Sequence, residues 1–178
     1  MPTRCNPVLV ALTGTPGTGK STIAALLEEK GFRVCELEEL ARRCGALRSY
    51  DLVRESWEVD LEVLERSIPK ERPLILVGHV SHLLPVDISI VLRCHPEALG
   101  ERLVAKGWDA AKVRENMEAE ALGVVTHETM EKTRAFEVDT TSASAEENAR
   151  VVSDILSGRG GGHEAGTVDW SEVILGWY

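Results

Sequence analysis

The chain has 178 residues, 43% of them hydrophobic, and a formal net charge of -9 at pH 7. This length suits one well-buried core with a small lid and disfavours two full domains. The acidic balance provides no basic excess for a polyphosphate backbone, which disfavours direct DNA binding but is compatible with a basic protein partner.

The first predicted element is a strand, the apolar run at residues 8–12, and a glycine-rich loop follows it. Residues 14–21 read GTPGTGKS and match the G-x-x-x-x-G-K-[ST] pattern, and a helix with apolar periodicity begins near Lys20. Glycines at positions 14, 17 and 19 let backbone N–H groups converge on phosphates. The alternative is a glycine-rich turn before an ordinary helix. Because both the strand and the helix flank the loop, we favour a nucleotide site in which Lys20 supplies charge and Ser21 can bind Mg²⁺.

The next elements alternate between helix and strand. The first helix ends at Lys30-Gly31, a strand is expected at 32–35, and a helix at 37–44 is closed by Gly45. Apolar and acidic residues alternate between 57 and 64, which predicts an extended segment. Buried strands are expected at 74–77 and 88–92, the first ending at Gly78-His79.

Three helices and a fifth strand complete the main pattern. One helix begins at 95–97 and ends at Gly107, and Asp109 is expected to cap a long helix that runs past Val125. A short strand at 136–138 and a helix at 145–156 follow. Arg102 and Lys106 lie one turn apart, so we expect both cations to reach one object. Such cations suit phosphoryl transfer, which depends on positioning and charge neutralisation.

Residues 158–178, at the end of the chain, differ in composition from the rest. Residues 158–162 are GRGGG, typical of a flexible linker. Beyond them, residues 169–172 resemble a capping box, and Trp170, Val173, Ile174 and Trp177 have the spacing of one helix face. This tail is therefore expected to dock, either on its own chain or on a partner.

Alternating strands and helices predict an α/β fold with a mostly parallel five-stranded sheet, helices on both faces and the ligand at the carboxyl ends of the strands. His79 follows a buried strand, so it either positions a water near the ligand or is structural; its place favours the first. The cysteines are far apart and form no C-x-x-C pair, and residues 1–7 do not resemble a signal peptide. A zinc knuckle, a disulfide scaffold and a membrane span are therefore disfavoured, and a cytoplasmic location is expected.

Several motifs together resemble the adenylate kinase isoenzyme 6 family, including its archaeal members. They are the loop 14–22, the stretch GHVSHLLP at 78–85, VLR at 91–93, ERL at 101–103, KGW at 106–108 and EN at 115–116. The resemblance implies a P-loop nucleoside monophosphate kinase domain over 1–157 with strand order 2-3-1-4-5. It also implies a monophosphate-binding region at about 36–60, a lid at about 105–115, a linker at 158–167 and a tail at 168–178.

The resemblance further implies transfer of the γ-phosphoryl of MgATP to AMP, with ATPase activity in small ribosomal subunit maturation through a platform ribosomal protein. The residues that it would assign to ATP are Gly14, Gly17, Thr18, Gly19, Lys20, Ser21, Thr22 and Lys106. It assigns Arg42 to the AMP phosphate, and we expect Glu38 and Arg93 to contact AMP as well. It matches His79 to the histidine of the family, and we expect Lys20, His79 and Arg102 to act in catalysis, with Ser21 on the metal.

One position departs from this family. The acidic residue expected two positions before His79 is Val77, which puts acid-assisted binding of Mg²⁺ in doubt. Two functions remain open: an enzyme that phosphorylates AMP, and a nucleotide-gated assembly factor with little kinase turnover. A GTPase is disfavoured because no Asn-Lys-x-Asp element follows a strand. Small-metabolite kinases share the loop but lack the glycine-histidine stretch.

Overall fold

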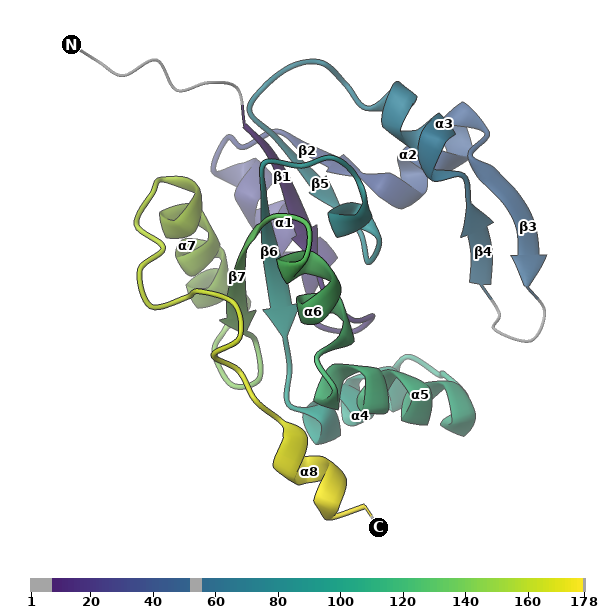
Figure 1. Cartoon of the computed structure of the whole chain (residues 1–178), viewed down its shortest axis with the longest axis vertical. Helices are drawn as coiled ribbons and strands as arrows, with labels where there is room; N and C mark the ends of the chain where they lie inside the picture. The colour runs from purple at the N-terminus through teal and green to yellow at the C-terminus, as the bar shows by residue number, and fades with distance from the viewer. Residues whose placement is uncertain (1–7, 52–55, 178) are drawn as a thin grey trace.

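A parallel five-stranded sheet forms the centre of the molecule in the computed structural model, which describes residues 8–51 and 56–177 (Figure 1). The strand order is β2-β5-β1-β6-β7. The bounds of the strands are β1 Leu9–Thr13, β2 Val34–Glu36, β5 Leu74–Val77, β6 Ile88–Arg93 and β7 Arg134–Asp139. Across the sheet, from β2 to β7, these are the second, third, first, fourth and fifth predicted strands, so the predicted fold class is confirmed. Cys5 and part of the expected region 36–60 lie outside the described residues.

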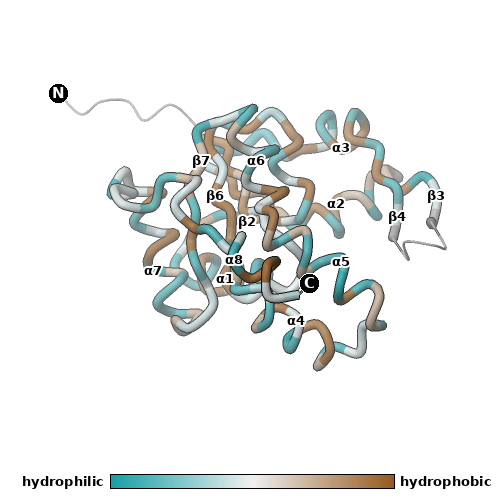
Figure 2. The backbone as a smooth tube through the Cα atoms, turned by 60° about the horizontal axis from the view of Figure 1, so that its bottom comes forward, coloured by the Kyte–Doolittle hydropathy of each residue, from teal (hydrophilic) through white to brown (hydrophobic). Residues whose placement is uncertain are grey.

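The central strands are buried on both faces, as their unbroken apolar sequences predict. On one face, α1 (Lys20–Glu29) and α7 (Ala145–Leu156) pack against the strands through side chains such as Leu27 and Val152. The opposite face is covered by α2 (Leu37–Cys44) and α3 (Leu61–Ser67), through Leu40 and Leu64. Hydrophobic residues accordingly concentrate along the strands in the interior (Figure 2).

A hairpin arm projects from the side of α2 (Figure 1). It consists of β3 (Leu47–Asp51) and β4 (Ser56–Val59), which pair antiparallel. The extended segment predicted at 57–64 is therefore only partly right, because the strand ends at Val59 and α3 begins at Leu61. The Asp60 carboxylate caps α3 by accepting hydrogen bonds from the N–H groups of Glu62 and Val63, both 3.1 Å.

Two further helices, α4 (Pro96–Ala105) and α5 (Ala110–Ala121), form a second arm with a small core of its own. Leu99, Leu103 and Val113 are buried there. The helix expected to run past Val125 is broken: α5 ends at Ala121, and α6 (Val124–Met130) starts after Gly123, whose φ is 62°. A left-handed glycine cannot continue an α-helix, so the chain turns back over the sheet.

The segment after α7 is held along the edge of the sheet. The Glu137 N–H donates to His163 O at 2.8 Å, and the Ala165 N–H donates to Ala135 O at 3.1 Å. The segment predicted to be a flexible linker thus pairs with β7. It leads to the short helix α8 (Ser171–Leu175), whose cap is Trp170, so the expected capping box is absent. The described part of the tail docks on its own chain.

Candidate active site

The phosphate loop lies at the carboxyl end of β1, between the sheet and α1. Gly14 has φ 136°, and a Cβ atom there would lie 2.4 Å from Leu92 O. A Cβ atom on Gly17, at φ 93°, would lie 2.9 Å from methyl carbons of Leu99 and Leu103. Side chains are excluded at both positions, because backbone and α4 pack directly against the loop. The loop therefore has the shape needed to present backbone amides to phosphates.

Lys20 folds back over the loop. Its Nζ donates to Gly14 O at 2.7 Å and to Thr15 O at 3.0 Å. Burial lowers the pKa of this ammonium to about 8, and the positive charge of Lys106 adds to the lowering, whereas Glu120 and Glu36 oppose it. A phosphate would compensate the buried charge better than two carbonyl oxygens do. Lys20 is thus positioned to bind an anion in the loop.

The buried carboxylate of Glu120 holds the phosphate loop on its inner side. Thr15 Oγ1 donates to Glu120 Oε2 at 2.5 Å, and Arg93 Nε donates to Glu120 Oε1 at 2.7 Å. Glu120 and Arg93 are each 2% exposed. The other nitrogens of Arg93 donate to Glu137, to Thr126 and to backbone carbonyls. The expectation that Arg93 approaches the monophosphate is therefore wrong: its donors are occupied inside the protein.

Glu137 joins this network to the C-terminal segment. Its Oε1 accepts from Arg93 and Thr126, and its Oε2 accepts from the backbone N–H groups of residues 166, 167 and 168 at 2.9, 3.0 and 3.1 Å. Burial by itself would raise the pKa of this carboxyl, but these hydrogen bonds and Arg93 outweigh burial and lower it. The motif search missed Glu120 and Glu137. The signal that could have found them is Arg93 itself, because an arginine ending a buried strand needs carboxylate partners.

Arg102 on α4 and Lys106 just after it are not brought to one partner. Arg102 donates to Thr140 O at 2.7 Å and to Thr141 O at 3.2 Å, so it holds the loop after β7. Thr140 Oγ1 in turn donates to Thr18 O of the phosphate loop at 2.9 Å. Lys106 follows α4, is exposed, and lies close enough to Lys20 to affect its pKa. Of these two side chains, Lys106 is the one exposed to solvent, whereas Arg102 supports the phosphate loop indirectly through Thr140.

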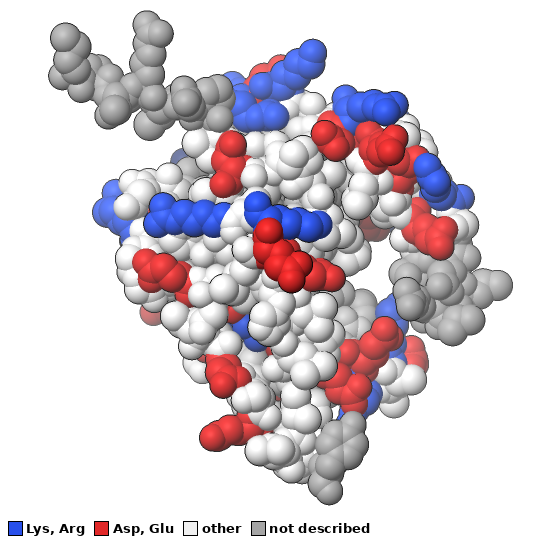
Figure 3. Space-filling model, viewed as in Figure 1, with Lys and Arg blue, Asp and Glu red and all other residues white. Residues whose placement is uncertain are grey.

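The residues expected at the monophosphate lie on α2. Arg42 pairs with Glu38, and their side chains are 64% and 75% exposed. Both lie on the arm of the molecule that carries the hairpin. Seen as a surface, the molecule is hollowed between this arm and the α4–α5 arm (Figure 3). The hollow therefore separates α2 from the α4–α5 arm.

His79 and its neighbours occupy the carboxyl end of β5. His79 is exposed to solvent, but nearby protein still removes part of its hydration. This desolvation is the main cause that lowers the pKa of the imidazole, and the positive charge of Lys20 is the next. It is therefore neutral at pH 7 and able to accept a hydrogen bond from water. His82 is structural: its Nδ1 lies 2.8 Å from Thr13 Oγ1 and its Nε2 lies 3.1 Å from Glu128.

The side chains of three further residues near this edge of the sheet determine how a metal could be bound there. Val77 is 1% exposed and packs in the core, so it cannot face a ligand. Glu36, which the sequence reading did not single out, ends β2 beside it. Burial and the charge of Glu28 raise the pKa of Glu36, while Lys20 opposes the increase. Ser21 is exposed at the start of α1. Within residues 8–51 and 56–177, no three His, Cys, Asp or Glu side chains cluster as metal ligands.

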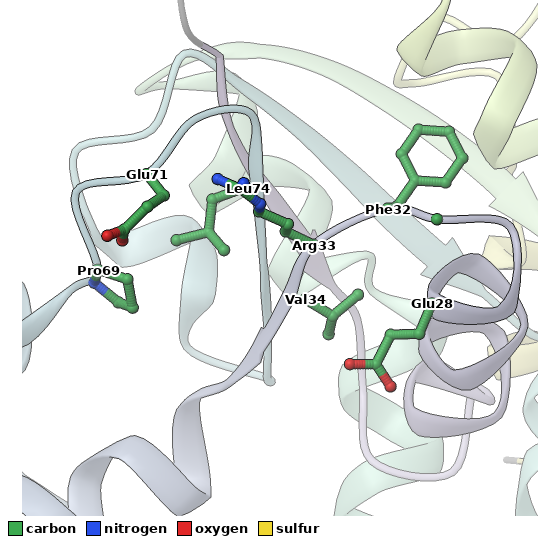
Figure 4. Close-up of a pocket in the computed structure, with 8 residues that line it drawn as sticks. Glu28, Phe32, Arg33, Val34, Pro69, Glu71 and Leu74 are labelled. Carbon is green, nitrogen blue, oxygen red and sulfur yellow. The ribbon is translucent and has the colours of Figure 1, made fainter.

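A surface pocket lies elsewhere and does not belong to this site. Its lining includes Glu28, Arg33, Pro69 and Leu74, at the amino ends of β2 and β5 (Figure 4). Parallel sheets place their ligands at the opposite, carboxyl edge. The phosphate loop is therefore the candidate site.

The sequence is similar to one family model and to several archaeal proteins. A family model described as an AAA domain matches residues 10–123. A protein of Archaeoglobus fulgidus named "Putative adenylate kinase" is 40% identical over 167 residues, covering 92% of each chain. Proteins of the same name from Pyrococcus abyssi and Methanothermobacter thermautotrophicus are 41% and 42% identical, and the alignments cover 93% and 94% of this chain and 93% and 100% of theirs.

Solved structures share the fold at low identity. Shikimate kinase from Acinetobacter baumannii superimposes with a TM-score of 0.63 at 16% identity, covering 86% of this chain and 94% of that one. The enzyme from Bacteroides thetaiotaomicron gives 0.58 at 14% identity, covering 85% and 99%. No helix in the described part of the chain is long and apolar enough to cross a membrane.

Proposed function

This chain belongs to the family of P-loop kinases that includes the archaeal adenylate kinases named above, and we propose that it transfers the γ-phosphoryl group of ATP to AMP, giving two ADP. The observation that carries the proposal is the position of the phosphate loop. It lies at the carboxyl edge of the sheet, with α4 packed on it and the arginine-bearing α2 across the surface hollow. A donor and an acceptor can thus meet between two arms of one small domain.

The loop and Lys20 bind the donor. Backbone amides of residues 14–21 and the amino end of α1 supply N–H groups to the terminal phosphates. Lys20 exchanges its two carbonyl partners for phosphate oxygens, which stabilises its charged form. Lys106 approaches from the lid. These contacts hold the γ-phosphorus in line with an oxygen of the AMP phosphate, which bonds to it as the bond to the β–γ bridging oxygen breaks and the donor leaves as ADP.

The donor set also fits Mg²⁺. The exposed Ser21 hydroxyl stands on the first turn of α1, and hydroxyl, carboxylate and phosphate oxygens are the ligands that Mg²⁺ prefers. Bound there, Mg²⁺ would neutralise charge on the phosphates and orient them. Val77 offers no oxygen, so a carboxylate must come from elsewhere.

Arg42 is the proposed contact to the AMP phosphate, and its present partner Glu38 would release it or share it. Its neighbour Arg43 provides a matched control, since it pairs with Glu39 at 3.6 Å on the same helix and is similarly exposed. We expect ADP formation to require both ATP and AMP. Arg42→Ala should raise the KM for AMP more than that for ATP, and Arg43→Ala should change neither. Activity indifferent to Arg42→Ala would remove the monophosphate assignment, and ADP formation independent of AMP would remove the kinase.

A second candidate function is supported by His79. A neutral imidazole near Lys20 can hold a water as an alternative acceptor, so the same closed site would hydrolyse ATP slowly. Slow hydrolysis suits a nucleotide-gated factor in small ribosomal subunit maturation. The partner of such a factor would be a basic ribosomal protein, which the net charge of -9 on this chain would attract. His79→Ala should lower hydrolysis measured without AMP, with His127→Ala as the control. A pull-down showing no nucleotide-dependent basic partner would count against this function.

A further inference from the structure

Val77 stands where the family resemblance leads us to expect an acid, and Glu36 on the neighbouring strand can supply a carboxylate instead. Glu36 and Val77 are Cα partners in the parallel pairing of β2 and β5, and each is the last residue of its strand. Val77 is in turn the partner of Leu12 in β1, two residues before the phosphate loop. A carboxylate on β2 is therefore displaced by a single strand from the expected position.

The side chain of Glu36 lies on the face of the sheet that α1 covers. Val34, two residues earlier, packs against the core under α1, and Cys35 packs against the opposite core. Because side chains alternate along a strand, Glu36 points to the α1 face, as Val77 does. Neighbouring strands are about 4.8 Å apart, a distance that a glutamate side chain can span. The carboxylate can thus approach the first turn of α1.

The carboxylate is also free for a ligand. Among the described residues, none makes a hydrogen bond or ion pair with the Glu36 side chain, which is half-buried. Besides burial, the charges that act on it most are the carboxylate of Glu28 and the ammonium of Lys20, and the exposed acids of α2 act less. A half-buried carboxylate with acidic neighbours and no partner is better stabilised by a divalent cation than by solvent.

We propose that Glu36 holds the Mg²⁺ of bound MgATP, directly or through one of its waters, in place of the acid that Val77 replaces. This rests on the proposed function, since the metal arrives with the nucleotide. Ser21 would bind the metal from α1, and Glu36 would bind it from β2. Mg²⁺ keeps several waters in such sites, so one carboxylate and one hydroxyl are enough beside the phosphates.

The test measures metal binding and does not depend on turnover. Mn²⁺ replaces Mg²⁺, and its dissociation constant is determined by electron paramagnetic resonance in the presence of a saturating non-hydrolysable ATP analogue, without AMP. The dissociation constant of the analogue is measured separately in EDTA. The variants are Glu36→Gln, which keeps the shape, Glu36→Asp, which keeps the charge, and the control Glu39→Gln on the exposed face of α2.

We expect Glu36→Gln to weaken Mn²⁺ binding by about 10-fold or more. The same variant should bind the metal-free analogue no more weakly than the unchanged protein, because a negative charge near the triphosphate is removed. Glu36→Asp should fall between the two, and Glu39→Gln should bind Mn²⁺ unchanged.

Three results would overturn the inference. Equal Mn²⁺ affinity in Glu36→Gln and the unchanged protein would leave the kinase proposal standing and remove the role of Glu36. Weaker binding of the metal-free analogue by Glu36→Gln would mean that the residue acts on the nucleotide or the fold. Failure of the unchanged protein to bind the analogue, with or without Mn²⁺, would overturn the proposed function and this inference with it.

Discussion

Thr15 in the phosphate loop donates a 2.5 Å hydrogen bond to Glu120, the penultimate residue of α5, although 105 positions separate them. Glu120 also accepts from Arg93 and from the Cys94 N–H at 3.1 Å, so one buried carboxylate connects the loop, the end of β6 and α5. The conformation of the loop therefore depends on a polar group that never faces the ligand. A fully hydrogen-bonded buried carboxylate of this kind restricts a glycine-rich loop to one conformation.

Removing the charge of Glu120 should destabilise the whole domain. In Glu120→Gln, Arg93 keeps only Glu137 as a buried counter-charge, and we expect the free energy of unfolding to fall by about 3 kcal/mol. Urea denaturation measures this. Glu118→Gln is the control: it lies two residues earlier, pairs with Arg114 and is 40% exposed, so its effect should stay below about 1 kcal/mol. Equal effects of the two variants would contradict the role given to Glu120.

The tail should loosen when Glu137 is neutralised. Three backbone N–H groups of residues 166–168 converge on Glu137 Oε2, and Glu137→Gln removes the charge that they share with Arg93. We expect faster hydrogen exchange at 166–168 and faster tryptic cleavage after the exposed Arg159. The exposed Glu146 on α7 supplies the control, Glu146→Gln. Unchanged exchange at these amides would show that the tail docks without Glu137.

The affinity for ATP should fall in alkaline solution. The pKa of Lys20 is about 8 without ligand, and phosphate binding favours its charged form and so raises that pKa. Below pH 8 the ammonium is already protonated; above it, binding must take up a proton, and affinity falls by up to about tenfold per pH unit. Calorimetric titrations from pH 7.5 to 9.5 measure this slope. Lys20→Arg, which stays charged throughout, should flatten it, and a flat profile for the unchanged protein would refute the assignment.

Gly17 should tolerate no side chain. Gly17→Ala places a methyl group against Leu99 and Leu103 in addition to forcing a positive φ, so it should distort the loop and abolish the thermal shift caused by ATP. Gly31 has a similar φ of 89° but open space around it. Gly31→Ala should cost about 1 kcal/mol of stability from backbone strain and leave the ATP shift intact. A normal shift in Gly17→Ala would contradict the close packing of α4 on the loop.

Most of the sheet was predictable because its signals are local. The runs at 74–77 and 88–92 are apolar without interruption, as strands buried on both faces must be. The sequence did not reveal β3 (LRSYD), because this strand of a separate two-stranded sheet has a mostly polar sequence with no clear alternation. The break at Gly123 was also missed, since apolar spacing continues across it while the backbone does not.

Within the site, the sequence alone determined the phosphate loop, because eight adjacent residues and their flanking strand and helix are sufficient for that local geometry. Only the tertiary structure decided where the charges go. It enclosed Arg93 between Glu120 and Glu137, turned Arg102 toward Thr140, and set Glu36 beside Val77. The physical reason is that a charged side chain is committed by its partners across the fold, and those pairings join positions tens of residues apart that carry no joint pattern in one sequence.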